Sequence, residues 1–340
     1  MIDIVKGVIG GAWTLLVGWI FPTAINVVLL LFAISAVRKH VHWINQIWPD
    51  SPAGLSLLAV ATAVLFGLIL SALQNPLYRI LEGYLLWPTR AYTAGCARQR
   101  NAKQLYIDRL KLIRLEGQAI GDLSVSDIIL LGNLRKDPRL AHFAAKDKKR
   151  TPPQVSVLRE RKARYPHDNE QITPTRLGNA IRRLEEYGYD RYRLDTQILW
   201  NELTGTVPEQ VRRQVEFARA SVDFFVCLLY GHVVVLISMI ALVAAHTHGA
   251  GVFDQLVIGI SVLVLIPVWY RAAVSSTDEW AAAVRALVNI GRKPLADALE
   301  LQLPPTLTTE RVMWDSVCRF SRISYTEQRA TLLYPFRKRR

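Results

Sequence analysis

Four long blocks of this sequence carry no formal charge, and they leave few folds open to the chain. They cover residues 7–37, 51–78, 224–245 and 255–270. A helix needs roughly 20 apolar residues to cross about 30 Å of hydrocarbon. The first three blocks supply that length outright, and the fourth supplies it once it starts at Val252. The sequence therefore predicts an all-α protein, a four-span transmembrane helix bundle with an α-helical cytoplasmic domain.

The blocks divide the chain into four parts. These are a transmembrane hairpin at 1–78 with spans at about 8–37 and 54–75, a cytoplasmic helical domain at 79–222, a second hairpin at 223–272 with spans at about 223–245 and 252–271, and cytoplasmic C-terminal helices with a basic tail at 273–340.

Lysine and arginine fix the expected orientation. Twenty-seven lie between spans two and three and 12 follow span four, whereas two lie between spans one and two and none between spans three and four. Basic residues near spans stay on the cytoplasmic side. We therefore expect a multi-pass protein of the inner (plasma) membrane with both termini in the cytoplasm.

The segments between the spans are predicted to be mostly helical. Apolar residues recur at three-to-four spacing from Thr89 to Glu116, as on one face of a helix. Thr173 and Pro174 predict the start of another helix, and Gly188 its end. Nothing breaks a helix between about 207 and 245, so one rod is expected to lead into span three.

Residues 135–171 differ from their surroundings. They combine many basic residues with four prolines and show little apolar periodicity. Proline clusters without periodicity are typical of loops, so a mobile basic loop is predicted here.

Small residues recur at a spacing of four along the first two spans. Such strips let helix backbones approach closely in lipid, either within one subunit or between subunits. The predicted packing face consists of Gly7, Gly11, Ala59, Ala63, Gly67 and Ser71.

His232 is the ionisable residue that lies well inside a predicted span. An ionisable side chain inside the membrane suggests a functional site, although a neutral imidazole can also simply bond a neighbouring carbonyl or hydroxyl group. Together with the polar residues Thr23, Asn26 and Ser35 of span one, it forms the set of candidates for pore lining or gating.

Two His-x-His pairs follow spans one and three on the predicted outer side. They are His40 with His42 and His246 with His248. Four imidazoles could hold zinc or copper if the two spans bring the pairs together. No other cofactor is expected.

Basic clusters predict contact with the anionic inner leaflet of the lipid bilayer. The candidate residues are Lys146, Lys148, Lys149, Arg150, Arg337, Lys338, Arg339 and Arg340. Few aromatic residues lie among them, which argues against nucleic acid as a partner.

Local catalytic signatures are absent from the sequence. It contains no Walker loop, G-x-G-x-x-G, H-E-x-x-H, C-x-x-C or G-x-S-x-G motif. Each of these marks a particular chemistry, and we therefore expect that the protein is not an enzyme.

One stretch resembles a pattern in uncharacterised bacterial multi-pass membrane proteins. The matching residues are Pro174–Asn179 (PTRLGN) and, within Tyr189–Trp200, the Tyr-Asp-Arg-Tyr and Leu-Asp groups. The resemblance implies a shared cytoplasmic helical unit and no particular activity.

Two functions fit these features. The first is a homo-oligomeric channel or pore, gated through the cytoplasmic helices. Because four helices are too few to enclose a pathway, this function requires an oligomer. The alternative is a non-conducting membrane-anchored scaffold or sensor that docks a cytoplasmic protein partner. Topology alone does not decide between them, and the channel is the expectation carried forward.

Overall fold

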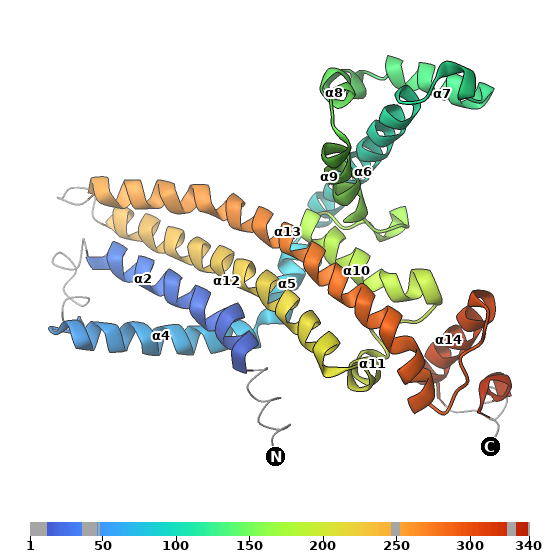
Figure 1. The fold of residues 1–340 in the computed structure, drawn as a ribbon. Coiled ribbons are helices and arrows are strands. Elements are labelled where there is room, and N and C mark those ends of the chain that lie inside the picture. Colours follow the sequence, from blue (N-terminus) through green and yellow to red (C-terminus); the bar gives the residue numbers. More distant parts are fainter. Residues whose placement is uncertain (1–11, 36–45, 47, 246–251, 325–330, 339–340) are drawn as a thin grey trace. The chain divides into compact units, whose positions relative to one another are not determined.

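The computed structural model describes residues 12–35, 46, 48–245, 252–324 and 331–338 (Figure 1). Helices make up the regular structure of these residues, and the β-type pairing among them is a bridge between Leu301 and Arg337. The prediction of an all-α protein is confirmed for this part of the chain. Its helices form two compact units, and each is considered by itself.

The first unit, called the membrane unit, comprises the described residues up to Leu77, residues 199–306 and the C-terminal tail. Four of its helices are long and apolar enough to cross a membrane, as predicted. Its elements are the π-turn η1 (Leu16–Ile20), α2 (Phe21–Ser35), α4 (Pro52–Ala72), α11 (Trp200–Thr206), α12 (Glu209–Ala245), α13 (Val252–Ala298) and the 3-10 turn η5 (Thr331–Phe336). Helix α5 (Gln74–Glu82) leads from this unit to the other.

The strip of small residues on α4 packs against span one of the same chain. Ala63 and Gly67 are buried, and Ala59 and Ser71 are half-buried. A Cβ atom at Gly67 would lie 3.0 Å from the Cα atom of Ile20. This close approach places Gly67 in an intramolecular contact, as small residues allow in lipid.

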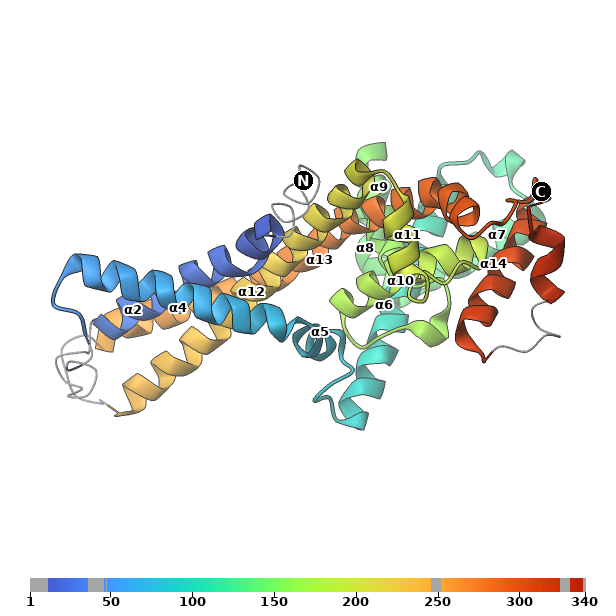
Figure 2. The same ribbon diagram turned by 90° about the horizontal axis from the view of Figure 1, so that it is seen from below.

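Helices α12 and α13 run side by side over much of their length (Figures 1 and 2). Helix α12 has 37 residues and α13 has 47, so at about 1.5 Å per residue each is longer than a bilayer is thick. The predicted rod before span three is therefore present, and span four continues in a second rod of the same kind.

The second unit, called the helical unit, comprises residues 78–198 and 307–324. Its elements are α6 (Thr89–Glu116), α7 (Val125–Lys136), α8 (Pro138–Lys148), α9 (Pro152–Ala163), α10 (Arg176–Tyr192), α14 (Leu307–Arg322) and short 3-10 turns at Ile120–Asp122 and Asn169–Gln171. The helix predicted from Thr89 to Glu116 is confirmed.

The prediction of a loop at residues 135–171 is wrong, because α8 and α9 lie there. Pro138 and Pro152 each occupy the first turn of a helix. Backbone N–H groups there make no hydrogen bond within the helix, so the N–H group that proline lacks is not needed. The Asp137 carboxylate accepts from the Arg139 amide at 2.9 Å and caps α8. Both helices are short and bury few side chains, so their apolar periodicity is weak.

Helix α10 also differs from its predicted bounds. It begins at Arg176 with Thr175 as its cap, because the Asn179 side chain bonds both backbone groups of Thr173 and holds that residue outside the helix. It continues through Gly188, where a Cβ atom would lie 2.6 Å from the Leu194 carbonyl oxygen. That glycine permits a close approach and does not end the helix.

Candidate functional site

Polar side chains from three helices of the membrane unit meet around His232. This side chain is 1% exposed. Its Nδ1 atom lies 2.8 Å from Asn26 Oδ1 on α2 and 2.9 Å from the Leu228 carbonyl oxygen on its own helix. On the other side of the ring, the Trp269 indole of α13 donates to Nε2 at 3.2 Å. One imidazole thus links α2, α12 and α13.

The contacts of His232 define its tautomer. An indole N–H can only donate, so Nε2 accepts and carries no hydrogen. Nδ1 faces two oxygen acceptors and therefore carries the hydrogen. The ring is neutral and both nitrogens are used, so adding a proton would break the bond to Trp269. The arrangement is that of a structural link between helices.

Two further polar groups of span one are satisfied at the same place. The Asn26 amide donates to the Pro22 carbonyl at 2.9 Å. The Thr23 hydroxyl donates to the Trp19 carbonyl at 2.7 Å and lies 3.2 Å from the Cys227 sulfur. These bonds meet the general requirement that buried polar groups find partners inside a membrane.

The predicted pore-lining residues of span one do not share one surface. A pore between subunits would be lined by side chains exposed on the single chain, but Thr23 and Asn26 are 4% and 6% exposed. Ser35 is exposed, and its hydroxyl donates to the Phe32 carbonyl at 2.7 Å. The structure therefore brings His232 and Asn26 together, with Thr23 nearby, and leaves Ser35 apart.

Several predicted site residues fall outside the described part of the chain. They are Gly7, Gly11, His40, His42, His246, His248, Arg339 and Arg340. Within the described residues, no group of three or more His, Cys, Asp or Glu side chains could hold a metal ion. The outer-face metal site stays a prediction.

The predicted lipid-contacting basic residues divide into two groups. Lys146, Lys148 and Lys149 are exposed on and after α8. The others that the structure describes have acidic partners. Arg150 bonds Asp147 at 2.7 Å, and in the membrane unit Lys338 Nζ lies 2.9 Å from Asp297 and Arg337 lies 3.8 Å from Glu300.

A buried ion pair, missed by sequence reasoning, holds α8 against α6. The Arg109 guanidinium makes two bonds of 2.7 Å to the Asp147 carboxylate and lies 4.1 Å from the centre of the Phe143 ring. Burial alone would raise the pKa of Asp147, but hydrogen bonds from Arg109 and Arg150 outweigh that effect and lower it. The partners lie 38 residues apart in the sequence, so no local sequence pattern predicts the pair.

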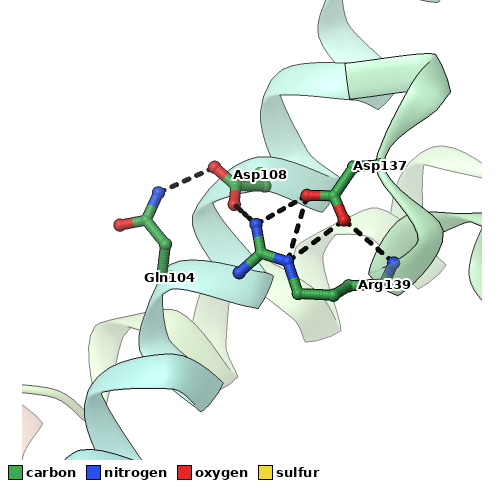
Figure 3. Close-up of polar contacts among 4 residues, drawn as sticks. All are labelled: Gln104, Asp108, Asp137 and Arg139. Atoms are coloured by element: carbon green, nitrogen blue, oxygen red, sulfur yellow. Dashed lines mark hydrogen bonds and ion pairs between the residues drawn. The ribbon is translucent and has the colours of Figure 1, made fainter. Parts of the chain in front are cut away.

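Arg139 makes a second polar link between the same two helices (Figure 3). Its guanidinium lies 2.6 Å from Asp137 at the start of α8 and 3.3 Å from Asp108 on α6. Gln104 donates to the other oxygen of Asp108 at 2.7 Å. Together the two links fix the orientation of α8 on α6.

A surface groove with a volume of about 350 Å³ lies between α6 and α9. It belongs to the helical unit alone. Its lining consists of four aliphatic and four basic side chains: Ile107, Leu110, Ile113, Val155, Lys111, Arg114, Arg159 and Lys162. Basic residues in this region were identified from the sequence, but the groove was not predicted, because the groove forms only when α9 is a helix packed on α6.

Few acidic groups compensate the basic rim of this groove. Lys111, Arg114 and Arg159 are exposed. Arg114 lies 3.7 Å from Asp127 on α7, a distance at which an exposed pair contributes little. The groove thus offers an apolar surface bordered by basic side chains. The chain matches no protein-family model, no curated protein and no solved structure with which it was compared.

Glu82, at the end of α5, predicts a pH dependence of stability. Burial raises the pKa of Glu82 to about 7, the neighbouring Glu185 adds to the rise, and Arg79 and Arg182 oppose it. The folded chain therefore holds a proton that the unfolded chain releases above its ordinary pKa of 4.5. Stability contributed by this group is full below about pH 4.5 and declines as the pH rises toward about 7.

Glu82→Gln is expected to remove most of this decline. At about pH 8 the free energy of unfolding of the variant should exceed that of the native chain by roughly 1–2 kcal/mol. The full rise in pKa from 4.5 to about 7 would give more at about 1.36 kcal/mol per pKa unit, but solvent reaches part of the carboxyl group and weakens the effect. Urea unfolding near pH 5 and near pH 8 measures the difference, with Glu160→Gln at an exposed position of α9 as the control. An unchanged pH slope in Glu82→Gln would contradict the assignment.

Proposed function

We propose that the chain is a non-conducting, membrane-anchored docking protein. Its helical unit lies on the cytoplasmic side, as the distribution of lysine and arginine favours, and its groove binds an acidic amphipathic helix of a partner protein. The observation that carries this proposal is the lining of the groove, which has four aliphatic side chains, four basic side chains and no acidic one.

The spacing of the apolar residues favours a helix as the occupant. Ile107, Leu110 and Ile113 follow one another at intervals of three along α6, which at about 1.5 Å per residue extends over nearly two turns. An amphipathic helix places its apolar side chains in such a groove. Acidic residues on its flanks would then face the basic rim, where complementary charge speeds association and sets specificity.

The polar groups of the spans give the channel expectation less support. Thr23 and Asn26, which were expected to line a pathway between subunits, are buried within one chain. His232 is bonded at both ring nitrogens. The channel stays a prediction, and the same preparation used to test docking can test conduction.

A pair of peptides tests the docking proposal on the full chain in lipid nanodiscs. One is a labelled helical peptide of about 18 residues with leucines on one face and glutamates beside them, and the other carries lysine in place of glutamate. We expect fluorescence anisotropy to show binding of the acidic peptide only. Lys111→Glu with Arg159→Glu should weaken that binding by about tenfold or more, or roughly 1.4 kcal/mol, and should create binding of the lysine peptide.

The control is Lys148→Glu with Lys149→Glu, which reverses two exposed charges outside the groove. It alters the general charge of the unit to the same extent as the groove variant. Because the two residues lie outside the groove, it should change peptide binding only slightly. Equal binding of both peptides, or equal effects of the two double variants, would overturn the proposed docking site. Ion flux into liposomes that contain the protein, above that of protein-free liposomes, would contradict the non-conducting role and favour the channel function.

A further inference from the structure

The segment between α5 and α6 exposes four consecutive large apolar side chains. Tyr84 is 45% exposed, Leu85 41%, Leu86 79% and Trp87 37%. Single exposed apolar residues are common on proteins, but a contiguous group indicates an interaction surface. The four residues are called the apolar loop.

The backbone holds Leu86 outward in an unusual conformation. Its φ angle is 63°, in the left-handed region that side chains larger than glycine rarely adopt. With 79% of the side chain exposed, burial against the protein does not compensate for this conformation.

The rest of the apolar loop is fixed by hydrogen bonds. The amides of Tyr84 and Leu85 both donate to the Arg79 carbonyl, at 2.8 and 3.1 Å. The Trp87 indole donates to the Ile80 carbonyl at 2.9 Å. The loop therefore presents Leu86 in a preformed geometry, tied back to α5.

Chain length keeps the apolar loop near the end of span two. Span two ends at Ala72, and the Leu77 carbonyl accepts from the Tyr230 hydroxyl of α12 at 2.7 Å. From Leu77 the chain continues in α5 to Glu82 at about 1.5 Å per residue and then for four residues at no more than about 3.5 Å each. Leu86 thus lies within roughly 20 Å of Leu77, wherever the helical unit is placed.

We propose that the apolar loop inserts into the headgroup region of the membrane that span two crosses, with Leu86 as the deepest residue. Tryptophan and tyrosine prefer this depth because their rings are apolar with one polar edge. Arg79 and Arg90, both exposed on either side of the loop, would face anionic headgroups. The loop is a second anchor, which would limit rotation of the helical unit about the end of span two.

Selective labelling tests the depth of the loop. The native cysteines Cys96, Cys227 and Cys318 are all buried, so Leu86→Cys in the full chain can be labelled alone with a polarity-sensitive dye. In nanodiscs with a nitroxide at headgroup depth, the dye should be quenched several-fold more strongly than on Val125→Cys. That reference residue is an exposed apolar position of α7, 76% exposed. Leu85→Cys should give an intermediate value.

The outcomes separate lipid from other contacts. Strong quenching at Leu86→Cys and weak quenching at Val125→Cys support the proposal. A blue-shifted dye without lipid quenching would indicate a protein contact and would overturn it. Equal quenching at the two sites would overturn it as well. The result does not depend on peptide binding in the groove, which lies on α6 and α9.

Discussion

Gly231→Ala is expected to cost the membrane unit about 3 kcal/mol of unfolding free energy, at the upper end of what overpacking usually costs. A Cβ atom at this position would lie 2.0 Å from Asn26 Nδ2 and 2.2 Å from Asn26 Cγ. The Asn26 amide must move, and its movement breaks the bond to His232. Unfolding of the detergent-purified protein by increasing fractions of SDS, followed by tryptophan fluorescence, measures the loss.

Gly259→Ala is the matched control on α13. There the nearest atom to an added Cβ is Met239 Cε at 4.0 Å, an ordinary contact, so stability should stay within about 0.5 kcal/mol of the native value. A second variant identifies the cause. Adding Asn26→Ala to Gly231→Ala removes the clash, and the double variant should be more stable than Gly231→Ala alone. If it is less stable, the clash with Asn26 is not the source of the effect.

This polar link shows what the sequence could predict of the site and what it could not. The apolar blocks predicted the spans, and His232 and Asn26 were both selected as candidates for pore lining or gating because they are polar residues inside predicted spans. Their pairing was not predicted, since the two residues are 206 positions apart. It depends on which spans are neighbours and on how each helix is rotated, and neither property follows from hydropathy.

Apolar periodicity and the absence of helix breakers predicted the long helices better than the short ones. Helices α6 and α12 match their predicted bounds within about two residues, which is the usual uncertainty of helix ends. Helices α8 and α9 were missed because prolines at a first turn were taken for loop residues. The groove was missed as a consequence, since Val155, Arg159 and Lys162 line it only when α9 is helical.

The small-residue strip of α4 illustrates a different limit. Its spacing predicted a packing face, and two residues of that face, Ala63 and Gly67, are buried. Spacing alone could not distinguish contact within a chain from contact between chains, because both need the same short side chains. The approach of Gly67 to Ile20 assigns the buried part of the strip to the chain itself.

Asp147→Ala is expected to destabilise the helical unit by about 3–5 kcal/mol, because it leaves a buried charge without its partner. Arg109 and Asp147 are 5% and 4% exposed, and Arg109 would remain in the interior next to Phe143. Hydrogen exchange should detect the loss as faster exchange in α6 and α8, with the amides of α12 and α13 unchanged. Unaltered exchange in α8 would contradict the role given to the pair.

Two further variants separate the buried charge from the loss of packing. Glu116→Ala removes an exposed pair with Arg135, at 3.2 Å and with the arginine side chain 59% exposed, and should cost no more than about 1 kcal/mol. Arg109→Met with Asp147→Leu replaces the whole pair by apolar side chains and should recover most of the stability lost in Asp147→Ala, because such replacements are often neutral or stabilising. If the double variant is as unstable as Asp147→Ala, then the hydrogen bonds themselves hold α8 on α6. Recovery would instead mean that the pair chiefly fixes the position of α8 on α6. The position of α8 in turn determines which side of α6 is free to pack against α9 and form the groove.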